Sequence, residues 1–159
     1  MKYQHRGYSL FFAAHFDRDK GIDQGRLLLE HIDKGHQQIW VALSSHARGQ
    51  QREGFHQRGG MIPPAYRVPK LAQWKVQTSP TNLSHVKGVS GNFYKILPFK
   101  VTTDRNGERG DFGIHLDENV PGSLGCIVLS KKRFRDFENT MTRLREEKAI
   151  EIPLVIAYS

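Results

Sequence analysis

Apolar residues in this 159-residue chain fall mainly in short runs separated by glycine, proline and asparagine, and this pattern restricts the chain to a mostly β fold. Residues 8–16 are aromatic and apolar. Residues 26–32 and 38–44 flank an Asp-Lys-Gly turn, which predicts a β-hairpin. A polar loop is expected at 45–58. Further strands are expected at residues 65–68, 92–102, 111–116 and 150–158.

One stretch near the C-terminus has helical periodicity instead. Four apolar residues recur there at intervals of three, four and three: Phe134, Phe137, Met141 and Leu144. Ser130 stands where an N-cap is expected. Pro153 predicts that the final strand lies at an edge, because proline has no N–H to donate. The fold expected is α+β but mostly β: a compact sandwich or barrel with one main C-terminal helix and a terminal edge strand.

Charge and composition limit the partners and the domain count. Lysine plus arginine total 24 against 16 acidic residues, giving a formal charge of +8 and favouring an anionic partner such as nucleic acid, acidic lipid or cell wall. The basic residues are also spread along the chain, as solubility alone would require. No repeat or linker divides residues 1–159, so we expect one domain. We expect no membrane span and no signal peptide, because the apolar runs are too short.

The chemistry of the sequence centres on its lone cysteine, Cys126, which is either a buried apolar residue or a reactive thiol. His115 ends a predicted strand, and a glycine- and proline-containing loop leads from it to Ser123, Gly125 and Cys126. A nearby histidine can accept the thiol proton and, as a cation, stabilise the thiolate. The amides of Gly125 and Cys126 are candidate oxyanion donors, and Ser123 a residue that orients the loop or the substrate.

The order strand, histidine, loop, Ser-x-Gly-Cys and apolar run resembles the L,D-transpeptidase (YkuD-type) catalytic domain, including its L,D-carboxypeptidase-like members. Residues 58–66 (Arg-Gly-Gly-Met-Ile-Pro-Pro-Ala-Tyr) look like the segment that precedes the site in this family. Residues 40–44 match a strand before the variable loop of the family, and a helix and a strand follow the cysteine. The resemblance covers residues 26–158, and its specific part is the Ser-x-Gly-Cys region.

The resemblance implies that Cys126 is the nucleophile and His115 the general base, with the ring oriented by the carbonyl of Leu116 or Asp117. It implies attack on the bond after the L-centre of meso-diaminopimelate in a peptidoglycan stem tetrapeptide. D-Alanine leaves, and an amine or water then takes the acyl group. Such an enzyme needs no cofactor and acts as a monomer in the periplasm or at the cell wall. The chain would leave the cytoplasm by a route without a classical signal peptide, be a processed protein, or be released from its host.

Three departures from the family pattern bear on the substrate. Leu124 and Val128 stand where the family commonly has a polar residue and an Arg or Asn, and the His-to-Cys spacing is shorter than usual. These positions concern the substrate carboxylate and the acceptor, so hydrolysis is as well supported as transpeptidation. Arg58, Arg67 and Arg109 are the candidates to bind the substrate carboxylate.

Two alternative functions fit the same residues. One is a non-catalytic module that binds cell wall or, less expectedly, nucleic acid, using its basic charge and Phe55, Tyr66 and Trp74. The other is a cysteine endopeptidase of the phage-lysin or antibacterial-effector type, which as an effector would have an immunity protein as partner. The sequence has neither a His-Glu-x-x-His motif nor paired cysteines, so no metal site is expected.

Overall fold

The computed structural model describes residues 4–17, 21–22, 25–44, 54–56, 58–118 and 125–159. Its helical elements are α1 (Lys131–Glu146) and the 3-10 turns η1 (Gly54–His56) and η2 (Ala65–Arg67). Its strands are β1 (Tyr8–Ala14), β2 (Phe16–Asp17), β3 (Gly21–Ile22), β4 (Gly25–His31), β5 (Gly35–Ser44), β6 (Trp74–Gln77), β7 (Thr81–Asn82), β8 (Asn92–Leu97), β9 (Lys100–Thr102), β10 (Glu108–Gly110), β11 (Gly113–Leu116), β12 (Ile127–Leu129) and β13 (Glu151–Tyr158).

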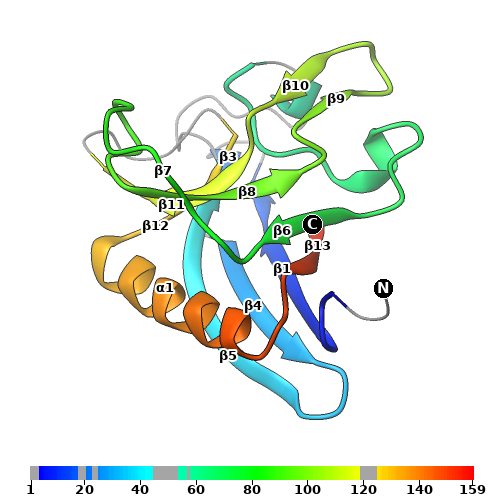
Figure 1. Ribbon diagram of the computed structural model, residues 1–159. Coiled ribbons are helices and arrows are strands. Elements are labelled where there is room, and N and C mark those ends of the chain that lie inside the picture. The colour runs from blue at the N-terminus through cyan, green and yellow to red at the C-terminus, as the bar shows by residue number, and fades with distance from the viewer. Residues whose placement is uncertain (1–3, 18–20, 23–24, 45–53, 57, 119–124) are drawn as a thin grey trace.

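Eight strands form a closed barrel in the order β11-β12-β5-β4-β1-β13-β6-β8, and the pairing of β8 with β11 closes it (Figure 1). The short β7 pairs with Asn92 and Phe93 of β8, while β9 and β10 form a separate hairpin that projects at the top of Figure 1. The predicted mostly β fold with one main C-terminal helix is therefore confirmed.

Alternating apolar side chains fill the barrel. In β1 and β4 every second residue is buried, and Leu10, Phe12, Leu27 and Leu29 are 0% exposed. The β4–β5 hairpin forms as predicted, and Gly35 in its turn has φ 71°, which glycine adopts without steric cost. Burying one such leucine or phenylalanine stabilises the fold by about 1.5–3 kcal/mol, so this alternation specifies the strand register.

Helix α1 completes the core below β12 in Figure 1. Its four predicted apolar residues are all buried, and Ser130 is the N-cap, although its hydroxyl forms no capping hydrogen bond. The ring of Phe137 packs edge-on against Trp40 of β5 at 5.4 Å and Tyr94 of β8 at 5.2 Å. Asp136, directly before Phe137 in the helix, accepts a 2.8 Å hydrogen bond from Trp40 Nε1. The helix therefore fixes the strands on either side of the β11–β12 pair.

The last strand, β13, lies between β1, to which it is parallel, and β6, to which it is antiparallel. Pro153 is opposite Lys75 of β6, while the register with β1 begins at Leu154. The register with β1 does not include Pro153, so at this residue the β1 side of the strand is an edge. A residue without an N–H is tolerated there because it interrupts no hydrogen bond of the sheet.

The strand predicted at residues 65–68 is wrong, because this segment forms the 3-10 turn η2. Arg67 N–H donates to the carbonyl of Pro64 at 3.0 Å, and Val68 N–H to that of Ala65 at 3.0 Å. These bonds close a turn directly after two prolines, where the short apolar run had suggested an extended chain. The loop expected at 45–58 lies largely outside the described residues. No helix among those described is long and apolar enough to cross a membrane.

Candidate active site

The parallel pair β11–β12 positions the two predicted catalytic residues. Its register places Ile114 beside Ile127, and both are 0% exposed inside the barrel. Because successive strand residues face opposite sides of a sheet, Gly113 and His115 face the outside of the barrel. Cys126 directly precedes Ile127, so the same alternation turns it to that outer face.

The thiol lies against the beginning of β11. Cys126 Sγ is 3.5 Å from the main-chain oxygen of Asp111 and also interacts with the main chain of Gly113. Residues two apart on one strand are about 7 Å apart, so His115 is the next residue along the face that the thiol contacts. The fold therefore brings His115 and Cys126 to one face of one strand pair.

The main chain fixes the orientation and the tautomer of His115. Its Nδ1 lies 2.8 Å from the carbonyl oxygen of Leu116. A carbonyl can only accept, so Nδ1 carries the proton and Nε2 carries the lone pair. Leu116 is one of the two residues suggested for this contact. The other, Asp117, acts through its charge, which favours the protonated ring.

A phenylalanine packs against this histidine on the outer face. The ring of Phe93 in β8 stacks on His115 with a centroid distance of 5.8 Å and an interplanar angle of 24°. Phe93 is only 4% exposed and lies outside the main core. A Cβ on Gly113 would come within 2.2 Å of the Phe93 ring, so only glycine at 113 lets that ring lie against β11. No sequence pattern had indicated Phe93, because its role depends on the β8–β11 closure.

Both candidate catalytic groups are uncharged at neutral pH. Burial lowers the pKa of His115 below its ordinary 6.5, although the Leu116 carbonyl and Asp117 oppose the shift. Burial also raises the pKa of the Cys126 thiol to about 11, with the nearby Asp111 charge adding to the rise. Burial therefore favours an uncharged thiol and an uncharged imidazole at rest over the expected thiolate–imidazolium pair.

Gly125 and Ser44 fix the peptide that precedes the thiol. The buried Ser44 hydroxyl, 1% exposed at the end of β5, donates to the Gly125 carbonyl at 2.9 Å and accepts from Ile62 N–H at 3.0 Å. Because a trans peptide directs its C=O and N–H in opposite directions, Cys126 N–H points away from β5, toward the β11 side where the thiol lies. Ser123, predicted to orient the loop, lies outside the described residues.

A short wall, residues 60–63, borders this peptide. Gly60 O lies 2.8 Å from where a Cβ on Gly125 would be, and Gly125 has φ 116°, which side-chain-bearing residues rarely adopt. Side chains from four strands bind the main chain of the wall: Arg109 at Gly60 O (2.7 Å) and Met61 O (3.2 Å), Ser44 at Ile62 N, Tyr158 at Ile62 O (2.7 Å) and Trp74 at Pro63 O (2.9 Å). The Gly-Met-Ile-Pro wall is therefore held beside Gly125, the residue directly before Cys126.

The structure separates the three arginines suggested for substrate binding. Arg109 is 5% exposed and lies beside Gly125. Arg58 is exposed. Arg67 pairs with Asp104 at 2.8 Å. The three therefore do not form one carboxylate-binding cluster.

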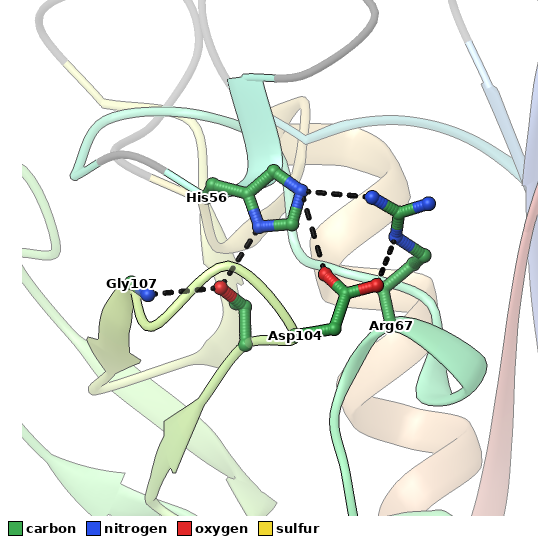
Figure 2. A network of polar contacts seen from close by, with 5 residues as sticks. His56, Arg67, Asp104 and Gly107 are labelled. Carbon is green, nitrogen blue, oxygen red and sulfur yellow. Dashed lines mark hydrogen bonds and ion pairs between the residues drawn. The ribbon is translucent and has the colours of Figure 1, made fainter.

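Figure 2 shows the polar network that holds Arg67. Its Nη2 donates to His56 Nε2 at 3.1 Å, so the His56 proton is on Nδ1, which contacts Thr103 Oγ1 at 2.8 Å. The same Thr103 hydroxyl accepts from Gly107 N–H at 3.1 Å. The network therefore joins η1 and η2 to the β9–β10 hairpin that carries Arg109.

The aromatic residues suggested for a binding surface do not act together. Tyr66 is 81% exposed, but Trp74 is 0% exposed and donates its indole N–H to Pro63, so the suggestion of a Trp74 stacking surface is wrong. The side chain of Phe55 lies outside the described part of the chain. Among the residues with described positions, no three His, Cys, Asp or Glu side chains gather as metal ligands.

Comparisons with models of known protein families, with curated proteins and with solved structures find no match for this chain.

Proposed function

We propose that this protein is a cysteine-dependent enzyme that cleaves an L,D bond in peptidoglycan stem peptides and transfers the acyl group to water or an amine. One observation carries the proposal. The Leu116 carbonyl fixes the proton of His115 on Nδ1, so His115 carries its basic Nε2 on the face of the β11–β12 pair to which Cys126 also belongs.

The first half of the reaction follows from the neutral resting pair. Cys126 Sγ attacks the carbonyl carbon of the scissile bond as its proton passes to His115 Nε2. The imidazolium formed is stabilised by the Leu116 carbonyl and the Asp117 charge, both of which favour the protonated ring. Cys126 N–H, directed to the thiol side by the Ser44–Gly125 bond, supports the oxyanion. The imidazolium then protonates the leaving amine, and a thioester remains.

The second half returns the enzyme to its resting state. Water or a substrate amine attacks the thioester carbonyl while Nε2 of His115 accepts a proton. The thiolate leaves and recovers the proton from the imidazolium. Water yields the shortened peptide, and an amine yields a cross-link or an exchanged D-amino acid. The +8 formal charge supports association with a negatively charged cell wall.

The test uses mass spectrometry of disaccharide-tetrapeptide muropeptides incubated with the wild type and with Cys126→Ala and His115→Gln variants. We expect loss of D-alanine, a dimer or an exchanged D-amino acid with the wild type alone. His85→Gln is the matched control, because His85 is an exposed histidine in the segment between β7 and β8 and has no role in the proposed reaction. Product formation by Cys126→Ala at the wild-type rate refutes the proposal.

The same assay separates the two alternative functions. Products from intact sacculi but not from tetrapeptide, still dependent on Cys126, would indicate endopeptidase activity. Salt-sensitive binding to sacculi without any product from the wild type would favour the binding module and reject catalysis.

A further inference from the structure

Arg109 brings a positive charge into the interior beside the candidate nucleophile. It comes from β10, in the hairpin that the Figure 2 network joins to η1 and η2, and its guanidinium stacks over the Phe112 ring at 5.1 Å. Burial lowers the pKa of Arg109 to about 10, so the group remains charged at neutral pH. Cys126 and Tyr158 would stabilise this charge when ionised, but burial raises the pKa of both groups, so both are uncharged at neutral pH. A buried charge is costly, which argues that its position serves the site.

The guanidinium contacts the two main-chain segments that border the thiol. Its nitrogens donate to the carbonyls of Gly60 and Met61 at 2.7 and 3.2 Å. Nη2 also lies 2.6 Å from the position of a Cβ on Gly125, so the group is packed against the residue directly before Cys126. One planar group therefore joins the wall at residues 60–63 to the peptide that carries the nucleophile.

An opposite charge also acts on the thiol. Asp111 is exposed, its main-chain oxygen is 3.5 Å from Cys126 Sγ, and its φ of 58° turns the chain directly before β11. The carboxylate of Asp111 disfavours the thiolate, whereas the guanidinium of Arg109 favours it. Cys126 is therefore subject to the opposing fields of a buried positive charge and an exposed negative charge.

We propose that Arg109 is a positioning residue that holds residues 60–61 against Gly125 and places a fixed positive charge beside Cys126, favouring anionic groups that dock or form there. This inference rests on the proposed function, in which Cys126 is the nucleophile. It predicts a preference for substrates with a carboxylate near the scissile bond, opposed by Asp111.

The test compares two alkylating agents of similar size at Cys126. Iodoacetate is an anion and iodoacetamide is neutral, and both react with the same thiolate, so the ratio of their rates measures the local field and cancels differences in access. Because the chain has one cysteine, intact-mass spectrometry reads this residue alone. We expect Arg109→Met to lower the iodoacetate-to-iodoacetamide ratio roughly fivefold and Asp111→Asn to raise it.

Two further variants separate charge from positioning. Arg109→Lys keeps the charge, so the alkylation ratio should stay within about twofold of the wild type. It cannot bond to both carbonyls with a planar fork, so muropeptide turnover should fall about tenfold. Arg135→Met, which removes an exposed arginine of α1, should change neither. If Arg109→Met does not fold by circular dichroism, Arg109→Gln replaces it, because glutamine keeps a carbonyl-directed donor without the charge.

Failure of this inference can be told from failure of the proposed function. An unchanged ratio in a folded, uncharged Arg109 variant overturns the inference even if Cys126 is essential for turnover. If Arg109→Lys turns over muropeptides at the wild-type rate, the positioning role is rejected. A shifted ratio with turnover that survives Cys126→Ala supports the charge placement and rejects the proposed function.

Discussion

The hydroxyl of Ser44 bonds two buried main-chain groups, so removing it tests the site architecture directly. Ser44→Ala leaves Ile62 N–H without its 3.0 Å acceptor and Gly125 O without its 2.9 Å donor. The residue is 1% exposed, so bulk water does not replace either bond. A buried polar group left without a partner costs about 1–3 kcal/mol. Counting the Ile62 N–H alone, we therefore expect the free energy of unfolding to fall by about 1–3 kcal/mol.

Urea unfolding followed by circular dichroism measures this change. With an m-value of about 2 kcal/mol/M, the midpoint should fall by about 0.5–1.5 M while m stays constant. Ser79→Ala is the matched control, because Ser79 is exposed and such changes usually stay within about 0.5 kcal/mol. A Ser44→Ala midpoint equal to that of Ser79→Ala would refute the reasoning, since the hydroxyl would then not be satisfying buried groups.

Three other outcomes follow from the structure. The proposed reaction needs neutral His115, whose pKa lies below 6.5. The value of kcat/KM should therefore be near its maximum at pH 7 and should fall as the pH drops through that pKa. A midpoint above pH 7 in the pH–rate profile would contradict this prediction. Gly113→Ala should destabilise the fold by about 1–3 kcal/mol in thermal melts, because the added Cβ would lie 2.2 Å from the Phe93 ring. The further change Phe93→Leu in the same chain should restore part of this loss of stability. Equal losses in the single and double variants would exclude the clash. Burial and Glu147 raise the pKa of Tyr8 to about 12, so the contribution of this shift to stability is complete below pH 10 and is lost as pH rises toward 12. Tyr8→Phe should reduce this alkaline loss of stability in urea titrations. An unchanged dependence of stability on pH in the variant would contradict the prediction.

Local patterns predicted the elements that local forces specify. The β4–β5 hairpin follows from two apolar runs around a glycine turn, and α1 from the spacing of its apolar residues. The segment after Pro64 was predicted wrongly as a strand, because a short apolar run does not distinguish a strand from a 3-10 turn.

The candidate site was predictable only in part. Cys126 and His115 stood out by residue type and context, and the carbonyl of Leu116 contacts the ring. The stacking of Phe93, the bridging hydroxyl of Ser44 and the burial of Arg109 depend on contacts between segments far apart in the sequence. A charged residue such as Arg109 is expected at the surface, and only the tertiary fold shows that main-chain carbonyls receive its donors.

The parallel pairing of β1 with β13 bears on when the site can assemble during synthesis. The first long strand of the barrel pairs with β4 on one edge, but its other edge is paired only after β13 has left the ribosome, and such long-range parallel contacts form slowly. Tyr158, in the same last strand, donates to the carbonyl of Ile62 in the wall beside Cys126. A nascent chain therefore lacks both a closed barrel and a fixed wall, and the catalytic arrangement appears only once translation of this segment is finished.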